Sequence, residues 1–288
     1  MTRVLIVGTG LVGAATAAAL EREGVDVVAV SRSTGVDLEA PGGPELLRDA
    51  IHVEAPEVVV LAHGPTSPEW CHAHPEASTT IHGGAARVAA ASGVRVVLVS
   101  SDVVFDGEAE AFRVQDRPRP VTAYGRAKVD AERRLANARE AAIVRVAMVY
   151  GCSRPGNSFA ERILRTLSAG LPTEAPVDQF VSPVFVDDVA DVVAAVAMRA
   201  DSPRLVHLGG PARPSRYVFA LEAAWQLGVP LDLVRPVTRE GTVWALRPKH
   251  SSLVTSWLPG ELRRRGLVAP PEGLRRTVQM AAAGANGS

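Results

Sequence analysis

RVLIVGTGLVGAATAAAL, residues 3–20, is the stretch that decides the fold. A short apolar run precedes three glycines, and small helix-forming residues follow them. This order predicts a strand, a G-x-G-x-x-G turn and a helix, in which the backbone can approach a pyrophosphate and the helix N-terminus offers N–H donors to it. We therefore expect a dinucleotide site here, with contacts from Gly8, Gly10, Leu11, Val12 and Gly13.

Composition excludes several other classes of protein. The chain has 288 residues, of which 47% are hydrophobic, and its 31 Lys and Arg balance 31 Asp and Glu. Zero net charge argues against a nucleic-acid partner. Since no run approaches the ~20 apolar residues of a membrane helix and no basic leader precedes the first strand, we expect no membrane partner and a cytoplasmic location. Two cysteines form no disulfide framework, as expected in a reducing compartment.

Strand and helix patterns alternate through the first half of the chain, as in a doubly wound parallel sheet of the Rossmann type. We predict a nucleotide-binding domain over residues 1–155, to which 180–206 return. Residues 156–179 and 207–288 would form a smaller α/β substrate lobe. The predicted strands lie within 4–8, 25–31, 57–64, 94–107 and 141–151, and the predicted helices within 12–24, 44–56, 75–93, 122–138 and 157–169.

The second predicted strand ends in Ser31 and Arg32. A site for NAD usually carries Asp or Glu here, which binds the ribose 2′-hydroxyl. A hydroxyl and a guanidinium suit a 2′-phosphate instead. The sequence therefore favours NADPH over NADH.

A candidate for proton transfer is TAYGRAK, residues 122–128. Tyr124 and Lys128 are four residues apart, so on a helix both side chains share one face. A nearby ammonium is expected to lower the pKa of the phenol, which could then exchange a proton with a ketone oxygen. Ser100 or Ser101, at the end of the preceding strand, could hydrogen-bond the same oxygen.

At this point the sequence resembles the extended short-chain dehydrogenase/reductases, and among them the dTDP-4-dehydrorhamnose reductase branch. The similar motifs are EWCHAHPEAS (69–78), SSDVVFDG (100–107), DRPRPVTAYGRAKVDAE (116–132), DQFVSPVFVDDVA (178–190) and RPKHSSL (247–253). The resemblance implies NADPH-dependent reduction of the 4-keto group of a 6-deoxy sugar linked to a nucleotide, dTDP being the expected one.

The resemblance also implies roles for particular residues. Ser101, Tyr124 and Lys128 would be catalytic, with Tyr124 and Lys128 also touching the coenzyme. Further coenzyme contacts would come from Asp37, Leu38, Ala62, His63, Gly64 and Ser100. The substrate would be bound by Thr66, Asp102, Val103, Met148 and Gln179. Arg247 is a further candidate, because a guanidinium there would suit the diphosphate of a nucleotide sugar. No metal site is expected, because Cys71, His72 and His74 lack a recurrent ligand spacing.

Four positions depart from the pattern of that branch. The glycine turn of that branch would begin with a glycine at position 7, where this chain has Val7, and Gly8 of this chain is an extra glycine. Val103 replaces a Tyr near the sugar, Met148 replaces a Trp, and His82 replaces an Asn. Because Val103 also stands where sugar dehydratases place an acid, 4,6-dehydration is disfavoured. The sugar itself is therefore left open.

Three alternatives remain at this stage. The same branch contains the regulatory β subunits of methionine adenosyltransferase, which resemble reductases but act as binding partners. An epimerase of nucleotide sugars and a reductase of a non-sugar ketone are the others. The family also suggests a homodimer.

Overall fold

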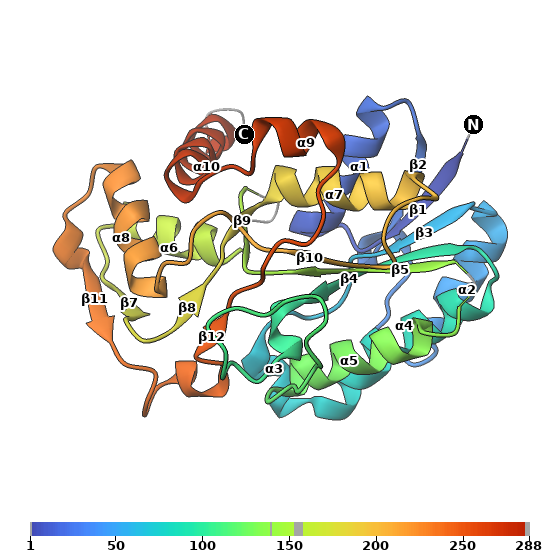
Figure 1. The fold of residues 1–288 in the computed structure, drawn as a ribbon, viewed down its shortest axis with the longest axis horizontal. Helices are drawn as coiled ribbons and strands as arrows, with labels where there is room; N and C mark the ends of the chain where they lie inside the picture. The colour runs from blue at the N-terminus through green and yellow to red at the C-terminus, as the bar shows by residue number, and fades with distance from the viewer. Residues whose placement is uncertain (1, 139, 153–157, 286–288) are drawn as a thin grey trace.

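The computed structural model describes residues 2–138, 140–152 and 158–285. Its centre is a parallel sheet of six strands (Figure 1). The strands are β1 (Arg3–Val7), β2 (Asp26–Val30), β3 (Val58–Leu61), β4 (Arg95–Ser101), β5 (Ala141–Val146) and β10 (Leu205–Leu208). Their order is β10-β5-β4-β3-β1-β2. The predicted doubly wound α/β fold is confirmed.

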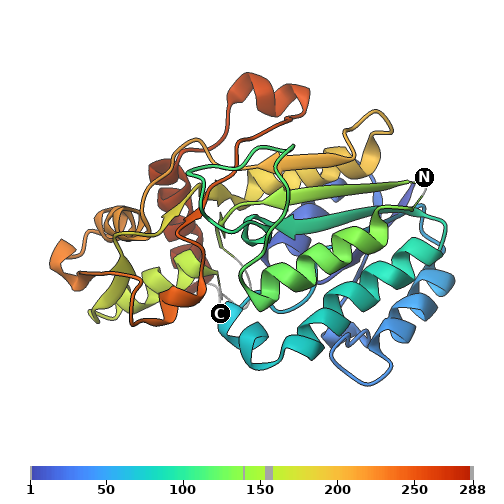
Figure 2. The same ribbon diagram turned by 60° about the horizontal axis from the view of Figure 1, so that its bottom comes forward.

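Helices cover both faces of this sheet (Figures 1 and 2). One face is covered by α1 (Leu11–Arg22) and α7 (Val186–Met198), and the other by α2 (Gly43–Glu54), α4 (Pro75–Ala91) and α5 (Ala123–Leu135). With both faces buried, the strands are nearly continuous runs of Val, Ile and Leu, as the sequence pattern indicates.

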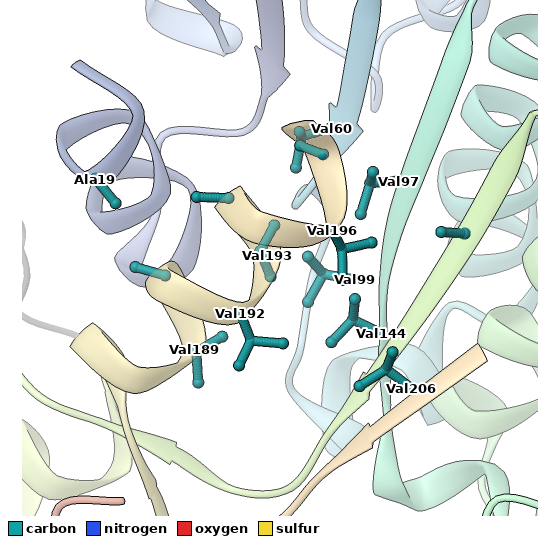
Figure 3. Close-up of a cluster of buried hydrophobic side chains, with 14 of the residues drawn as sticks. Ala19, Val60, Val97, Val99, Val144, Val189, Val192, Val193, Val196 and Val206 are labelled. Carbon is teal, nitrogen blue, oxygen red and sulfur yellow. The ribbon is translucent and has the colours of Figure 1, made fainter. Parts of the chain in front are cut away.

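The core beneath α7 consists largely of valines (Figure 3). Val189, Val193 and Val196 of α7 are fully buried and pack with Val97 of β4 and Val144 of β5. Each fully buried Val contributes roughly 1.5–3 kcal/mol relative to an exposed one. The face of α7 that carries these valines therefore anchors the helix to the sheet.

A smaller lobe lies to the left of the sheet in Figure 1. It comprises α6 (Phe159–Ser168), α8 (Arg216–Leu227), α10 (Pro270–Ala285) and the parallel pair β7 (Thr173–Pro176) with β11 (Val234–Val237). The other described strands form two short parallel pairs: β6 (Val149–Tyr150) with β9 (Val184–Phe185), and β8 (Phe180–Val181) with β12 (His250–Ser251). The remaining helices are α3 (Pro68–Ala73), α9 (Gly260–Arg265) and the 3-10 turns Arg32–Thr34, Asp102–Val104, Leu231–Leu233 and Val243–Leu246.

Several boundaries differ from the sequence prediction. Helix α6 begins at Phe159, and the predicted start at residue 157 lies outside the described residues, as does the predicted domain boundary at 155. Strand β10 crosses the expected boundary at residue 207, and Leu262 of α9 packs into the sheet core. The division into two domains at these positions stays a prediction. Among the described residues, no helix has the length and apolar character needed to cross a bilayer.

The strand order fixes where a ligand can bind. The chain passes from β1 to β2 on one side and then to β3 on the other side of β1. In open α/β sheets, ligands bind beyond the carboxyl ends of the strands at such a switch point. Val7 and Leu61 end the two strands beside it, so the glycine turn and residues 62–64 border that crevice.

Candidate functional site

The three glycines of the first turn have three different surroundings. Gly8 has a φ of +99°, and a Cβ there would lie 2.7 Å from the carbonyl oxygen of Ala62. A Cβ at Gly13 would overlap the carbonyl of Gly8, so this glycine lets α1 lie close to β1. At Gly10, the N-cap of α1, nothing lies within 4 Å of a Cβ. This open backbone is the position at which a pyrophosphate could approach, and Leu11 and Val12 follow it in the first turn of α1.

The end of β2 carries charged groups. Arg32 is exposed, and its guanidinium is 2.9 Å from a carboxylate oxygen of Glu39 and 3.6 Å from one of Asp37. Ser31 shares a hydrogen bond with Ser33 at 2.9 Å. Such exposed ion pairs are worth little, about 0–1 kcal/mol, so a phosphate dianion could displace Glu39. Next to Asp37, the buried Leu38 lines a surface hollow.

The predicted catalytic residues converge beyond β4. Ser101 ends that strand, and its hydroxyl donates to Oδ1 of Asp102 at 2.9 Å. It also lies close enough to the Tyr124 phenol to stabilise the ionised form of that group. Tyr124 and Lys128 lie in α5, which begins at the N-cap Thr122, whose side chain accepts from the N–H of Gly125. All three side chains are buried at this end of the sheet.

The expected lowering of the pKa of the Tyr124 phenol is wrong for this structure. Burial raises that pKa, and so does the nearby negative charge of Asp102. Burial also lowers the pKa of Lys128 to about 8. Instead of facing the phenol, the ammonium of Lys128 donates to the carbonyl of Val99 at 2.8 Å. The i, i+4 spacing places the two residues on one face of α5 but does not bring the ammonium of Lys128 to the phenol of Tyr124.

A pair of histidines lies beside this set. His63 and His82 are buried, with ring centroids 5.6 Å apart, and the ring of His82 is also 5.6 Å from that of Tyr124. Burial and the charge of Lys128 lower the pKa of His63 to about 3 and hold that of His82 well below its usual range. Both rings are therefore neutral at neutral pH. A Cβ at Gly64 would overlap the ring of His82, so a glycine is needed there.

Behind the catalytic residues lies a buried ion pair that the sequence did not reveal. Arg145 donates to Glu132 through Nε at 2.9 Å and Nη2 at 2.6 Å. Glu132 also accepts from the hydroxyl of Ser100 at 2.5 Å, and its charge raises the pKa of Lys128 against the effect of burial. Arg145 in turn contacts Nε2 of His207 at 3.2 Å. This network joins α5 to β4, β5 and β10.

The predicted substrate residues are only partly gathered. Asp102 is buried, and burial raises its pKa to about 6. Met148 accepts a hydrogen bond from Arg216 at 3.2 Å, and Gln179 is buried, with Nε2 donating to the carbonyl of Pro248 at 3.1 Å. The other three are Thr66, which is exposed after β3, Val103, which packs beside Tyr124, and Arg247, which is ion-paired with Glu69.

Sequence reasoning missed the residue at the centre of this group. Arg216, the first residue of α8, is buried, and its guanidinium lies over the rings of both Phe159 and Trp244. The guanidinium of Arg247 also lies over Trp244, 4.8 Å from the ring centroid. A single Arg in a helix pattern gives no signal of this kind, because its partners come from α6 and the 3-10 turn of Val243–Leu246.

The cysteine and histidines of α3 and its C-cap do not form a cluster among the described residues. Cys71 is buried, whereas His72 and His74 are exposed, and His74 stacks on Trp70. Within the part of the chain that the structure describes, no three side chains of His, Cys, Asp or Glu are placed to hold a metal ion.

The parallel sheet, the glycine turn beyond β1 and the Ser-Tyr-Lys set beyond β4 define a class of protein, the Rossmann-type NAD(P)-dependent oxidoreductases. The chain belongs to the family described as the RmlD substrate binding domain, which matches residues 1–271. This confirms the resemblance to the dTDP-4-dehydrorhamnose reductase branch.

Individual relatives agree with this family. The dTDP-4-dehydrorhamnose reductase of Mycobacterium tuberculosis is 30% identical over 257 residues, covering 82% of this chain and 79% of that protein. Methionine adenosyltransferase 2 subunit beta of Rattus norvegicus is 29% identical over 225 residues, covering 74% of this chain and 67% of that protein. Among solved structures, the dTDP-4-dehydrorhamnose reductase of Bacillus anthracis in complex with NADP has a TM-score of 0.82 and 22% identity, covering 97% of this chain and 99% of that one.

Proposed function

We propose that the protein reduces the 4-keto group of a 6-deoxy sugar carried on a nucleotide, dTDP in particular, with NADPH as the reductant. The observation that carries the proposal is the convergence of Ser101, Tyr124 and Lys128 at the carboxyl end of β4. This end of the sheet also holds the glycine turn, so a coenzyme and a carbonyl could meet there. The family supports the same reaction class.

NADPH, when bound, supplies a hydride to the ketone carbon. Ser101 would donate a hydrogen bond to the ketone oxygen, and Tyr124 would donate the proton that this oxygen needs. The raised pKa of the Tyr124 phenol keeps it protonated, which suits a proton donor in the direction of reduction. Lys128, with a pKa of about 8, could return a proton to the phenolate once it turns from the carbonyl of Val99.

The chain's residues fit the coenzyme. Gly10 leaves open backbone for the pyrophosphate, and Arg32 lies where the 2′-phosphate of NADPH would need a cation. His63 and Gly64 follow β3 beside the switch point, and Nδ1 of His63 is buried without a partner among the described residues. We propose that Asp37 and Leu38 contact the adenine and that Ala62, His63, Gly64 and Ser100 line the coenzyme.

The test is consumption of NADPH in the presence of dTDP-linked 4-keto-6-deoxy sugars. The wild-type protein should oxidise NADPH with at least one of them, and a Tyr124→Phe variant should not. A Tyr217→Phe variant is the matched control, because Tyr217 is half-buried and packs against the core of the smaller lobe. Equal rates in the wild type and Tyr124→Phe, or no consumption with any of several such sugars, would show that the substrate class is wrong.

A second candidate is a regulatory subunit without turnover. The 29% identity to methionine adenosyltransferase 2 subunit beta favours it. That function requires stable binding to a synthetase from the native cell, measured by pull-down, together with no NADPH oxidation. A sugar-nucleotide epimerase would instead convert substrate with no net change in the coenzyme. A reductase of a non-sugar ketone would oxidise NADPH with that ketone but not with a sugar nucleotide.

We also propose that the protein is a cytoplasmic homodimer, as the family resemblance suggests. Sedimentation equilibrium of the purified chain tests the oligomeric state. A mass of one chain at all concentrations would contradict a dimer.

A further inference from the structure

Arg216 is a buried cation, and its guanidinium has no carboxylate partner in the described part of the chain. The residue is 9% exposed. Its Nη1 donates at 3.2 Å to Sδ of Met148, which is a weak acceptor, and its Nε has no acceptor among the residues that the structure describes. Among the described residues, no carboxylate oxygen lies within 4.0 Å of its guanidinium, whereas Arg247 does have such a partner in Glu69. Within the described part of the chain, the guanidinium of Arg216 thus has no strong acceptor.

The guanidinium is nevertheless held firmly in place. Its central carbon lies 4.4 Å from the ring centroid of Phe159 and 5.2 Å from that of Trp244. The backbone N–H of Arg216 donates to the carbonyl of Gln179 at 2.9 Å, which fixes the start of α8. Cation–π contacts and a fixed backbone restrain the side chain before any ligand arrives.

Burying an unpaired charge is costly, because the charge loses its hydration. The cost is increased here by Arg247, whose charge repels that of Arg216. Asp102 provides some attraction, but its carboxylate already accepts from Ser101 at 2.9 Å and from Ser251. An arrangement of this kind is stabilised when an anion from outside the chain completes it.

We propose that Arg216 binds an oxyanion of the substrate, a phosphate or a carboxylate, in a subsite closed by Met148, Phe159 and Trp244. The proposal rests on the proposed function, in which the substrate is a sugar nucleotide. Three predicted substrate residues act on Arg216: Met148 accepts from its guanidinium, Gln179 accepts from its backbone N–H, and the charge of Asp102 attracts it. The oxyanion could be the diphosphate of the nucleotide or a carboxylate on the sugar. In either case Arg216 recognises the charge of the ligand beside Met148.

The test measures binding without turnover. The full-length chain, loaded with NADP⁺, is titrated in a calorimeter with dTDP, thymidine, dTDP-glucose and dTDP-glucuronate. Loss of charge-assisted hydrogen bonds should weaken binding of the anionic group by about 10- to 100-fold in Arg216→Met. Arg213→Met is the matched control, since Arg213 is exposed three residues earlier, and it should bind all four ligands as the wild type does.

The ligands distinguish the two sources of the anion. If the diphosphate is bound, Arg216→Met weakens dTDP and leaves thymidine unchanged. If a sugar carboxylate is bound, the wild type prefers dTDP-glucuronate to dTDP-glucose and Arg216→Met abolishes the preference. Wild-type affinity of Arg216→Met for both dTDP and dTDP-glucuronate overturns the proposal.

Two controls keep this result separate from folding and from the reaction. Thermal unfolding with NADP⁺ shows whether Arg216→Met is folded. If it is not, Arg216→Lys provides the same comparison, because it keeps the charge but lacks the planar fork, and should bind the anionic ligand more weakly than the wild type. Failure to oxidise NADPH with any keto sugar would refute the proposed function, while Arg216-dependent binding of dTDP would still stand.

Discussion

The ion pair between Glu132 and Arg145 lies directly behind the catalytic residues, and replacing Glu132 with Gln should destabilise the whole fold. The two side chains are 7% and 5% exposed, and two hydrogen bonds of 2.9 and 2.6 Å join them. Removing one charge from a buried pair leaves the other uncompensated, at a cost of about 3–5 kcal/mol. We therefore expect the free energy of unfolding of Glu132→Gln to fall by about that amount.

Urea unfolding, followed by circular dichroism, measures this change. Glu272→Gln is the matched control, because Glu272 also pairs with two arginines, Arg275 and Arg276, but on the surface of α10. That variant should unfold as the wild type does, since surface ion pairs contribute little. The double variant Glu132→Leu with Arg145→Met, which removes both charges, should be more stable than Glu132→Gln. If Glu132→Gln and Glu272→Gln have the same effect, the buried pair does not stabilise the protein as argued.

Three further predictions concern the coenzyme site and acid stability. Gly10→Ala should fold normally but bind NADPH weakly. Gly13→Ala should lose stability in thermal unfolding, because a Cβ at Gly13 would overlap backbone and one at Gly10 would not. Equal stability of the two variants would contradict this prediction. Arg32→Ala should weaken NADPH binding by about 10- to 100-fold and leave NADH unchanged in a fluorescence titration, and a parallel loss for both would refute 2′-phosphate recognition. The pKa of His63 is about 3 in the folded protein and 6.5 in its ordinary state. Between these two pH values the unfolded chain binds more protons than the folded one, so the free energy of unfolding falls as the pH drops below 6.5. At pH 5 the loss is about 2 kcal/mol. In urea titrations, His63→Leu should lose less stability at acid pH than the wild type does, whereas the exposed control His72→Asn should lose as much. If His63→Leu loses as much stability as the wild type, His63 is not the origin of the loss.

The sequence predicted most of the central sheet because its strands carry a local signal. Runs of Val, Ile and Leu separated by helical periodicity indicate a parallel sheet with covered faces. Strands β2 to β5 lie within the predicted ranges, and β1 begins one residue earlier, at Arg3. The motif that begins α5 likewise places Tyr124 and Lys128 on one helix. What spacing could not show was burial, which raises the pKa of the Tyr124 phenol instead of lowering it.

The residues around the candidate substrate site were less predictable, also because burial and contacts are not visible in the sequence. Phe159, Arg216 and Trp244 are far apart in the sequence and come from two helices and a 3-10 turn that have no common period. Their meeting depends on how the smaller lobe folds. Arg247 was predicted for the pocket, but its ion pair with Glu69 of α3 joins two segments that no motif linked.

Transfer of deuterium from NADPH to the sugar tests the proposed reaction most directly. The protein is incubated with NADPH labelled at nicotinamide C4, on the hydrogen that is transferred, and with a dTDP-linked 4-keto-6-deoxy sugar that it turns over. Reduction places the label on C4 of the product, and the Tyr124→Phe variant forms no such product. Product that lacks the label, or labelled product formed equally by Tyr124→Phe, would contradict hydride transfer assisted by Ser101, Tyr124 and Lys128.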